Sequence, residues 1–352
     1  MKPRGVVYAS GVVSPIGTTA LETAMLLRTG LPALTEAPLS AGDPKSGVTM
    51  GITRLLSPTT FGAERATELL GVALAELINS VRDAGGLAIR DLKLRVAVAI
   101  DEDLPGSTTL MRNQLTALFV NQLGHADIRF SPPNGPGGAA GAAHVLDDAL
   151  TALSLREVDA VLLCGVHTDY DPERISRLVA EDRLFSPENP NAVIPGETAA
   201  ALLIGRADLV HRIRMTPRLE VFSIGTAKGD LTPFSDKSVF EDFALTSALE
   251  TAMAGLADEL KLGFALTDLG CEQYRVREFY ASLTRVAERF MEPVSVDAPA
   301  QRIGALGAAS MPVGLAIASE MATRGYAPAP LGVIVGGSEQ GARAAMVVGT
   351  PS

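Results

Sequence analysis

Few side chains in this 352-residue sequence could do covalent chemistry, and its two cysteines are the first to consider. No CxxC pair or Cys/His spacing predicts a structural metal site, and two cysteines do not make a disulfide framework. Cys271 has Glu272 beside it, and a neighbouring carboxylate raises the pKa of a thiol rather than activating it. Cys164 falls within an apolar run of strand length, which predicts a core residue.

The four histidines do not predict a catalytic or metal site either. His144 falls on a helix that we expect to be buried, so packing is its expected role. The other three follow the ends of predicted elements and share no metal-ligand spacing: His125, His167 and His211. The acidic run 101–103 is predicted to be a solvated turn, and phosphate-binding glycine motifs are absent. The sequence therefore predicts neither a metal ion nor a cofactor.

The stretch most suggestive of a site is Ser131–Asp148, a Pro/Gly turn followed by small residues and then by helix formers. Small residues at a helix start let another backbone come close. That end of a helix also presents unpaired N–H groups and a partial positive charge, and many enzymes hold a nucleophile or an anion there. Here the expected position of a reactive side chain holds Gly or Ala, so the pattern predicts the frame of a site without its reactive group.

Composition limits the class of protein. A hydrophobic content of 47%, 34 glycines and no tryptophan are typical of an α/β protein. The net charge of −10 comes from 30 basic and 40 acidic residues, and no Lys/Arg cluster with interleaved aromatic residues predicts nucleic-acid binding. An acidic surface disfavours docking on anionic membranes, and no apolar segment approaches the length of a membrane span. With few cysteines, the expected location is the reducing cytoplasm.

Apolar runs of strand length alternate with segments of helical periodicity. We expect strands at 5–13, 94–100, 128–130, 158–166 and 198–205, and helices starting near 18, over 63–84 and 108–123, and after 141. Segments 30–60 and 169–195 are predicted to be irregular loops. Continuous apolar strands between helices predict sheets covered by helices on both faces.

The second half repeats part of this order. Gly304–Ser310 has the small-residue pattern of Gly138–Ala143, and each copy precedes a helix, a strand that ends in glycine, and a second apolar strand. The pattern indicates two similar α/β halves; chance likeness between Ala/Gly-rich segments is the alternative. Charged residues and Pro217 interrupt the apolar pattern near residue 210, so we predict an N-terminal half at 1–210 and a C-terminal half at 211–352.

Segments spread over nearly the whole chain resemble, in order, the thiolase superfamily, and more specifically the β-ketoacyl synthases of fatty acid and polyketide assembly. These segments are Val12–Gly17, Gly137–Ala143, Val161–Val166, Pro195–Ala200, Gly304–Ser310 and Val335–Ser338. The resemblance implies a layered α-β-α-β-α fold made of two similar α/β halves. It also implies pairing of two subunits across a two-fold axis, as a homodimer or as a heterodimer with a related subunit, with 128–130 as the candidate contact.

The chemistry that the resemblance implies does not carry over. Family members use a cysteine at a helix start and two histidines, or a histidine and an asparagine, which stabilise a thioester oxyanion and assist decarboxylation. Here Gly138 matches the cysteine, the segment 267–272 around Gly270 matches the first histidine's loop, and Gly304 matches the second histidine. We therefore expect no catalytic residues of the family's kind.

The leading hypothesis is a ketosynthase-like protein that has lost condensing activity and acts as a binding, scaffold or partner subunit. One alternative is an acyltransferase or 3-oxoacyl synthase with a relocated site and Cys271 as nucleophile, and another is an acyl-CoA or acyl-carrier-protein binding protein. An acyl thioester or another protein is the expected partner, rather than nucleic acid or membrane. Residues expected at the pocket are Gly138, Glu197, Cys271, Glu272, Gly304 and Ser338, with Glu197 tying down nearby backbone.

Overall fold

The computed structural model describes residues 2–40, 47–101, 107–124, 127–131, 137–236 and 238–351. The strands are β1 (Gly5–Val13), β2 (Thr35–Ser40), β3 (Gly47–Met50), β4 (Leu94–Ala99), β5 (Asp127–Phe130), β6 (Ala160–Thr168), β7 (Glu197–Gly205), β8 (Leu219–Lys228), β9 (Leu262–Thr267), β10 (Phe290–Asp297), β11 (Leu331–Gly337) and β12 (Ala342–Gly349). The helices are α1 (Ala20–Leu27), α2 (Gly62–Asp83), α3 (Arg112–Leu123), α4 (Gly138–Ser154), α5 (Pro172–Ala180), α6 (Val210–Ile213), α7 (Ala244–Met253), α8 (Gln273–Arg285), α9 (Ala300–Ile303) and α10 (Ser310–Thr323).

The strand order shows the internal repeat directly. The large sheet runs β10-β9-β11-β12-β8-β1-β7-β6-β4-β5. In each half, two parallel pairings are followed by two antiparallel ones: β5-β4-β6-β7-β1 in the first half and β10-β9-β11-β12-β8 in the second. The prediction of two similar α/β halves is confirmed, whereas a division at residue 210 stays a prediction.

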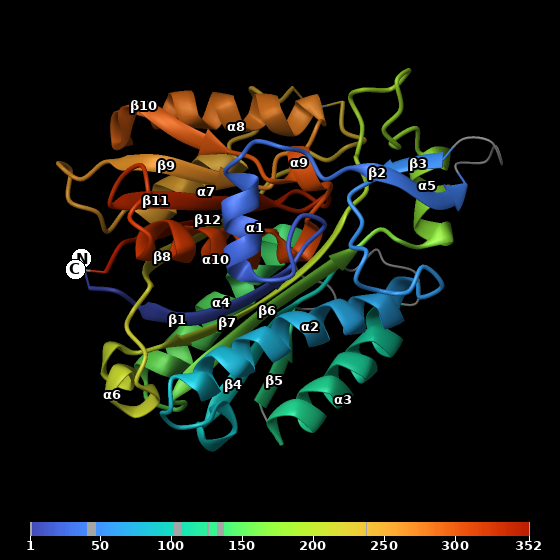
Figure 1. Ribbon diagram of the computed structural model, residues 1–352. Coiled ribbons are helices and arrows are strands. Elements are labelled where there is room, and N and C mark those ends of the chain that lie inside the picture. The colour runs from blue at the N-terminus through green and yellow to red at the C-terminus, as the bar shows by residue number, and fades with distance from the viewer. Residues whose placement is uncertain are drawn as a thin grey trace.

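The two halves meet where β1 pairs antiparallel with β8, with Gly5–Val7 opposite Leu219–Val221. Figure 1 shows α4 and α10 between the two halves of the sheet, with α2 and α3 on one outer side and α7 and α8 on the other. One apolar cluster fills the central layer, and two more lie under the outer helices. The predicted α-β-α-β-α layering is therefore observed.

Local sequence signals explain why α1 and α2 form where the sequence predicts helices. The Thr19 side chain accepts a hydrogen bond from the Glu22 backbone N–H at 3.1 Å, which caps α1. Leu70, Leu74 and Leu77 recur at helical spacing on α2, and all three are fully buried. The strand predicted at 128–130 is β5.

Two predicted loops contain regular structure. Segment 30–60 includes the antiparallel pair β2 and β3, and segment 169–195 includes α5. Asp171 caps α5 by accepting from the Glu173 and Arg174 backbone N–H groups, and Pro172 occupies the first helical position. This cap-and-proline pattern is a helix-start signal. These elements pack on each other through a small apolar cluster that includes Met50 and Ile175.

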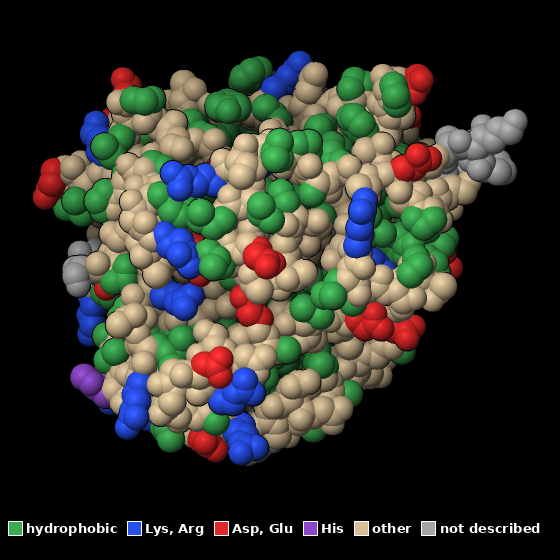
Figure 2. Space-filling model, in the orientation of Figure 1, with side chains coloured by type: hydrophobic (Ala, Val, Ile, Leu, Met, Phe, Trp, Pro, Cys, Tyr) green, Lys and Arg blue, Asp and Glu red, His purple; other side chains and the backbone are tan. Residues whose placement is uncertain are grey.

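On the face shown in Figure 2, basic and acidic side chains are interspersed with apolar ones. None of the described helices combines the length and the apolar character needed to cross a membrane.

Candidate functional site

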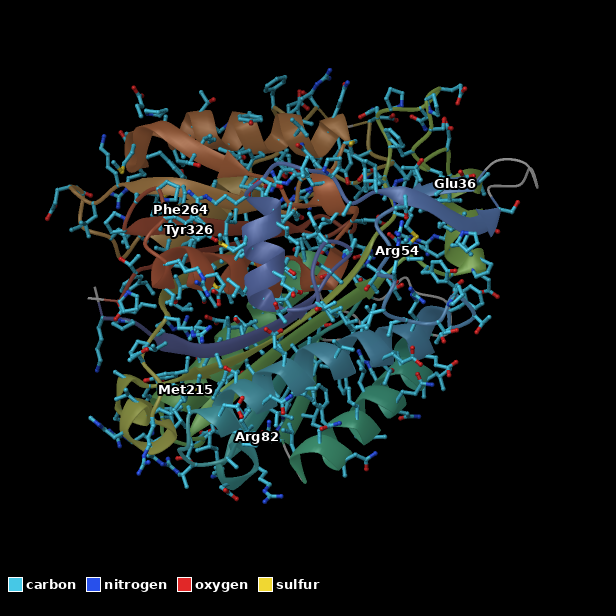
Figure 3. All side chains as sticks on the ribbon, viewed as in Figure 1. Glu36, Arg54, Arg82, Met215, Phe264 and Tyr326 are labelled. Carbon is cyan, nitrogen blue, oxygen red and sulfur yellow. The ribbon has the colours of Figure 1, made fainter. Side chains whose placement is uncertain are left out.

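The described residues form a cavity of about 140 Å³ at the amino end of α4. Four of the six predicted pocket residues line it: Gly138, Cys271, Glu272 and Ser338. The other two, Glu197 and Gly304, are not among its lining residues. A larger, more open hollow of about 300 Å³ lies beside α1, where Figure 3 labels Phe264 and Tyr326. It contains none of the predicted site residues.

Gly138 is the first residue of α4 and has a φ of +57°. A Cβ atom here would lie 3.4 Å from Ser338 Oγ and 3.5 Å from Asp101 Oδ1, so a side chain has room. The left-handed backbone, however, is one that L-residues adopt at a cost of about 1–2 kcal/mol. The helix start faces the cavity with its partial positive charge and without a side chain of its own.

Gly304 has a different task. Its φ is +79°, and a Cβ atom would lie 2.3 Å from the Pro195 carbonyl oxygen, so no side chain fits. The glycine allows α9 and the segment before β7 to touch. The neighbouring Ala305 lines the cavity, as does Gly270, where an added Cβ would meet nothing within 4 Å.

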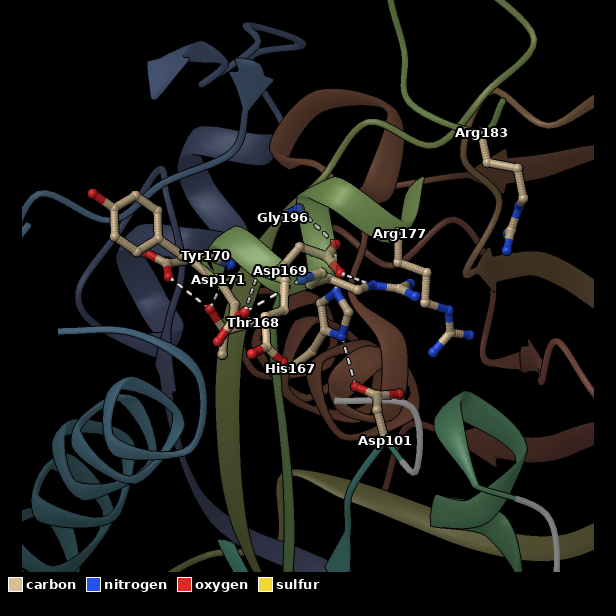
Figure 4. A network of polar contacts seen from close by, with 12 residues as sticks. Asp101, His167, Thr168, Asp169, Tyr170, Asp171, Arg177, Arg183 and Gly196 are labelled. Carbon is tan, nitrogen blue, oxygen red and sulfur yellow. Dashed lines mark hydrogen bonds and ion pairs between the residues drawn. The ribbon is translucent and has the colours of Figure 1, made fainter. Parts of the chain in front are cut away.

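His167, near the end of β6, lies between two carboxylates. Its Nδ1 is 2.6 Å from Asp101 Oδ2, and its Nε2 is 3.0 Å from Asp169 Oδ2 (Figure 4). Burial alone would lower the pKa of His167, but the two carboxylates outweigh it and raise the pKa to about 10. The ring is therefore an imidazolium at neutral pH, and both of its nitrogens donate. It has no free lone pair with which to act as a general base.

Asp169 is held by three partners. Besides His167, its Oδ1 accepts from Arg174 Nε at 2.9 Å, and its Oδ2 accepts from the Gly196 N–H at 3.1 Å. Burial would raise the pKa of this carboxyl, yet the two cations hold it well below the usual range. Asp101 similarly accepts from the Ala308 N–H at 2.9 Å. The expected solvated turn is thus wrong for Asp101, which joins β4 to the α10 segment; residues 102 and 103 lie outside the described residues.

The ion pairs continue around the cavity wall. Arg174 Nη2 is 3.7 Å from Glu339 Oε1, and Arg183 Nη2 is 2.8 Å from the same oxygen. Arg183 also donates to Glu272 Oε1 at 3.0 Å through Nη2. Burial raises the pKa of Glu272 despite this cation, while Arg183 and Arg174 lower the pKa of Glu339 against its burial. Glu272 therefore carries the less well compensated carboxylate.

The loop predicted to replace the first histidine's loop contributes a second ionic group. Asp268 follows β9 directly, and its Oδ1 lies 3.0 Å from Arg275 Nη2. Its Oδ2 accepts from the Gly337 N–H at 2.7 Å, which ties β9 to the end of β11. Arg275 also pairs with Glu278, which binds Arg343 at 2.7 Å. The cavity thus lies between two networks of alternating charge.

No protein-family model matches the sequence, and no curated protein matches it. Solved structures do match. One is a chain of the AntDE:AntF complex, a type II polyketide synthase ketosynthase with its acyl carrier protein, at TM-score 0.79 and 11% identity, covering 100% of both chains.

Two further structures agree. The ishigamide ketosynthase/chain length factor matches at TM-score 0.74 and 16% identity, covering 99% of each chain. The ketosynthase ApeO in complex with its chain length factor ApeC, from Xenorhabdus doucetiae, matches at TM-score 0.73 and 12% identity, covering 99% of this chain and 98% of that one. The fold is the thiolase-like fold of the ketosynthases.

Within this ketosynthase-like fold, two lining residues carry a thiol or a hydroxyl, Cys271 and Ser338, and neither group is activated. Cys271 is half-buried, and burial together with Glu272 raises its thiol pKa. Ser338 Oγ donates to the Gly137 carbonyl oxygen rather than to a base. Cys164 is buried in β6, as predicted, and burial raises its pKa as well.

Glu197 holds backbone beside the cavity rather than facing it. It is fully buried and forms a two-point ion pair with Arg65, at 2.6 Å from Nε and 2.8 Å from Nη2. Its carboxylate also accepts from the Thr53 N–H at 2.7 Å and from the Thr168 hydroxyl at 3.1 Å. These bonds tie the start of β7 to the end of β6 and to the chain before α2.

Two of the remaining histidines, His144 and His211, are not among the residues that line the cavity. His144 is half-buried on α4, and burial lowers its pKa. His211 lies on α6, and residue 125 is outside the described part of the chain. Among the described residues, no group of three His, Cys, Asp or Glu side chains could hold a metal ion.

Proposed function

We propose that this protein is a ketosynthase-like subunit without condensing activity that acts by binding a partner subunit. One observation carries the proposal: the helix start at the cavity presents Gly138, and the imidazole that lines the cavity is held between two carboxylates. Covalent catalysis needs a nucleophile with a base or a lowered pKa. Among the described residues that line this cavity, Cys271 has a raised thiol pKa and the Ser338 hydroxyl donates to a backbone carbonyl, so neither side chain meets this requirement.

The relocated-site alternative receives less support. It requires Cys271 to be a thiolate at neutral pH, and both its burial and Glu272 favour the neutral thiol. It also requires a neutral imidazole as the base, whereas His167 is charged and both its nitrogens are occupied. Ligand binding in the cavity remains compatible with the proposal, because binding needs no nucleophile.

A protein partner is supported by the edge of the sheet. β5 is the last strand in the order and pairs with β4 alone among the described strands, so its other edge has no strand partner among them and offers backbone N–H and C=O groups for pairing. Two of the matched structures are ketosynthases with a chain length factor, so a subunit of similar fold is a suitable partner. We propose that β5 pairs with a second copy of this chain or with a related ketosynthase.

Light scattering of the purified chain, alone and co-expressed with a ketosynthase, tests this. Successive N–H groups of a strand point to opposite edges, so Ile128→Pro and Arg129→Pro form a matched pair. The variant that loses an N–H at the open edge of β5 should dissociate the complex. The other variant loses an N–H that faces β4, so it should lower the stability of the folded chain instead. A chain that stays monomeric in both settings contradicts the proposed partner.

A further inference from the structure

The cavity wall leaves one strong hydrogen-bond donor unused. Arg174 is only 6% exposed, and its Nε and Nη2 face Asp169 and Glu339. Its Nη1 is buried and has no partner among the described residues. Because Arg174 lines the cavity, an acceptor that a ligand brings to this nitrogen would supply the hydrogen bond that a buried donor otherwise lacks.

The same wall contains a carboxylate, that of Glu272, whose negative charge is only partly balanced by neighbouring cations. Glu272 lines the cavity and accepts two hydrogen bonds from Arg183 at Oε1, and no hydrogen bond to Oε2 is found among the described residues. Burial raises the pKa of this carboxyl, so a cation near it would be stabilised. Arg183 and Glu339 link Glu272 to Arg174, so this carboxylate and the unpaired nitrogen of Arg174 belong to one continuous chain of side chains.

The balance of charge selects the kind of ligand. Cationic lining groups are His167, Arg174 and Arg275, and anionic ones are Asp101, Asp268, Glu272 and Glu339. A simple anion would meet several carboxylates, and a simple cation would meet three fixed positive groups. A molecule that carries one charge of each sign, without net charge, satisfies both ends with charge-assisted hydrogen bonds.

We propose that this cavity binds a small zwitterion of the amino-acid type, with its carboxylate at Arg174 and its ammonium group at Glu272. Size agrees, because a cavity of roughly 150 Å³ holds a six-membered carbon ring, and this one measures about 140 Å³. The inference rests on the proposed function only in treating the cavity as a place for binding rather than for covalent chemistry.

The test is binding of glycine, alanine, β-alanine and valine to the full chain, followed by thermal unfolding and calorimetry, with acetate and methylammonium as single-charge probes. A zwitterion should raise the melting temperature, and each single-charge probe should not. Glu272→Gln keeps the shape of the side chain and should weaken binding at least about tenfold. Glu64→Gln, an exposed change on α2, should leave binding unchanged.

Arg174→Gln should also abolish binding. If the Arg174→Gln protein does not fold, Glu272→Gln alone tests the inference. Binding of acetate or methylammonium alone, or zwitterion binding that Glu272→Gln leaves intact, overturns the inference. So does the absence of any shift. If no shift is seen, but the chain still pairs with its partner subunit and forms no acyl adduct, the ligand inference fails and the proposed function is retained.

Discussion

His167 Nδ1 lies 2.6 Å from Asp101 Oδ2, although the two residues are 66 positions apart in the sequence. The contact joins the ends of two neighbouring parallel strands, β6 and β4. Asp169 closes the other side of the ring. The cavity at the start of α4 is therefore bordered by an imidazolium that is fixed on both sides, a group suited to hold structure and charge rather than to move protons.

This contact predicts a dependence of stability on pH. The pKa of His167 is about 10 in the folded protein and about 6.5 in an unfolded chain. A raised pKa gives stability that is complete below about pH 6.5 and is lost as the pH rises toward 10. We expect the free energy of unfolding in urea to fall over this range. His167→Gln should make the free energy of unfolding depend less on pH and should lower it by roughly 3–5 kcal/mol at pH 7. An equally steep dependence on pH in this variant would show that His167 is not the group responsible.

Loss of the buried Glu197 carboxylate should be costly. Glu197→Ala leaves the Arg65 guanidinium, which is also fully buried, without its two-point partner, at an expected cost of roughly 3–5 kcal/mol. Arg82→Ala is the control, because the Arg82–Asp83 pair is largely exposed and worth about 0–1 kcal/mol. Urea unfolding measures both. Similar losses in the two variants would show that Glu197 has no special structural role.

The two glycines matched to the histidine positions should respond differently to alanine. Gly304→Ala combines a left-handed φ with a Cβ at 2.3 Å from a backbone oxygen, so we expect a loss of roughly 3 kcal/mol or a failure to fold. Gly270→Ala meets nothing within 4 Å and should change the free energy of unfolding by less than about 0.5 kcal/mol. A well-tolerated Gly304→Ala would contradict the close packing against Pro195.

Thiol labelling tests the state of Cys271. Because its pKa is raised by burial and by Glu272, we expect iodoacetamide to react with it more slowly at pH 7.5 than with a free cysteine, and faster as the pH rises. Glu272→Gln should speed the reaction. Cys164 should label only on unfolding, since it is fully buried. Rapid labelling of Cys271 at pH 7 would favour the relocated-site alternative instead.

Much of the frame could be predicted from the sequence because its signals are local. The apolar runs of β1, β6 and β7, the helical periodicity of α2 and the repeated small-residue stretches lie in continuous segments. Gly138, Cys271, Glu272 and Ser338 were placed near the cavity by matching such segments. The sequence does not predict the pair β2–β3, because its short strands contain little periodicity.

The charged network around the cavity could not be predicted from the sequence, because its residues come from segments that are far apart in the chain. His167 follows an apolar run and has no motif around it, and only the parallel pairing of β4 and β6 brings Asp101 to it. Arg174 depends in the same way on α5, which lies in a segment whose sequence predicts a loop. Its Asp171–Pro172 start was the available signal. The spacing His167-x-Asp169 at the end of a strand is a weaker signal of the charged network.

Whether the cavity lacks a working nucleophile is tested by the intact mass of the purified protein after incubation with a labelled acyl-CoA, for the wild type, Cys271→Ala and Ser338→Ala. We expect an unchanged mass for all three proteins and no release of carbon dioxide from a malonyl thioester. An acyl adduct on the wild type that either substitution removes would show that the cavity holds a working nucleophile, and would contradict a purely binding role.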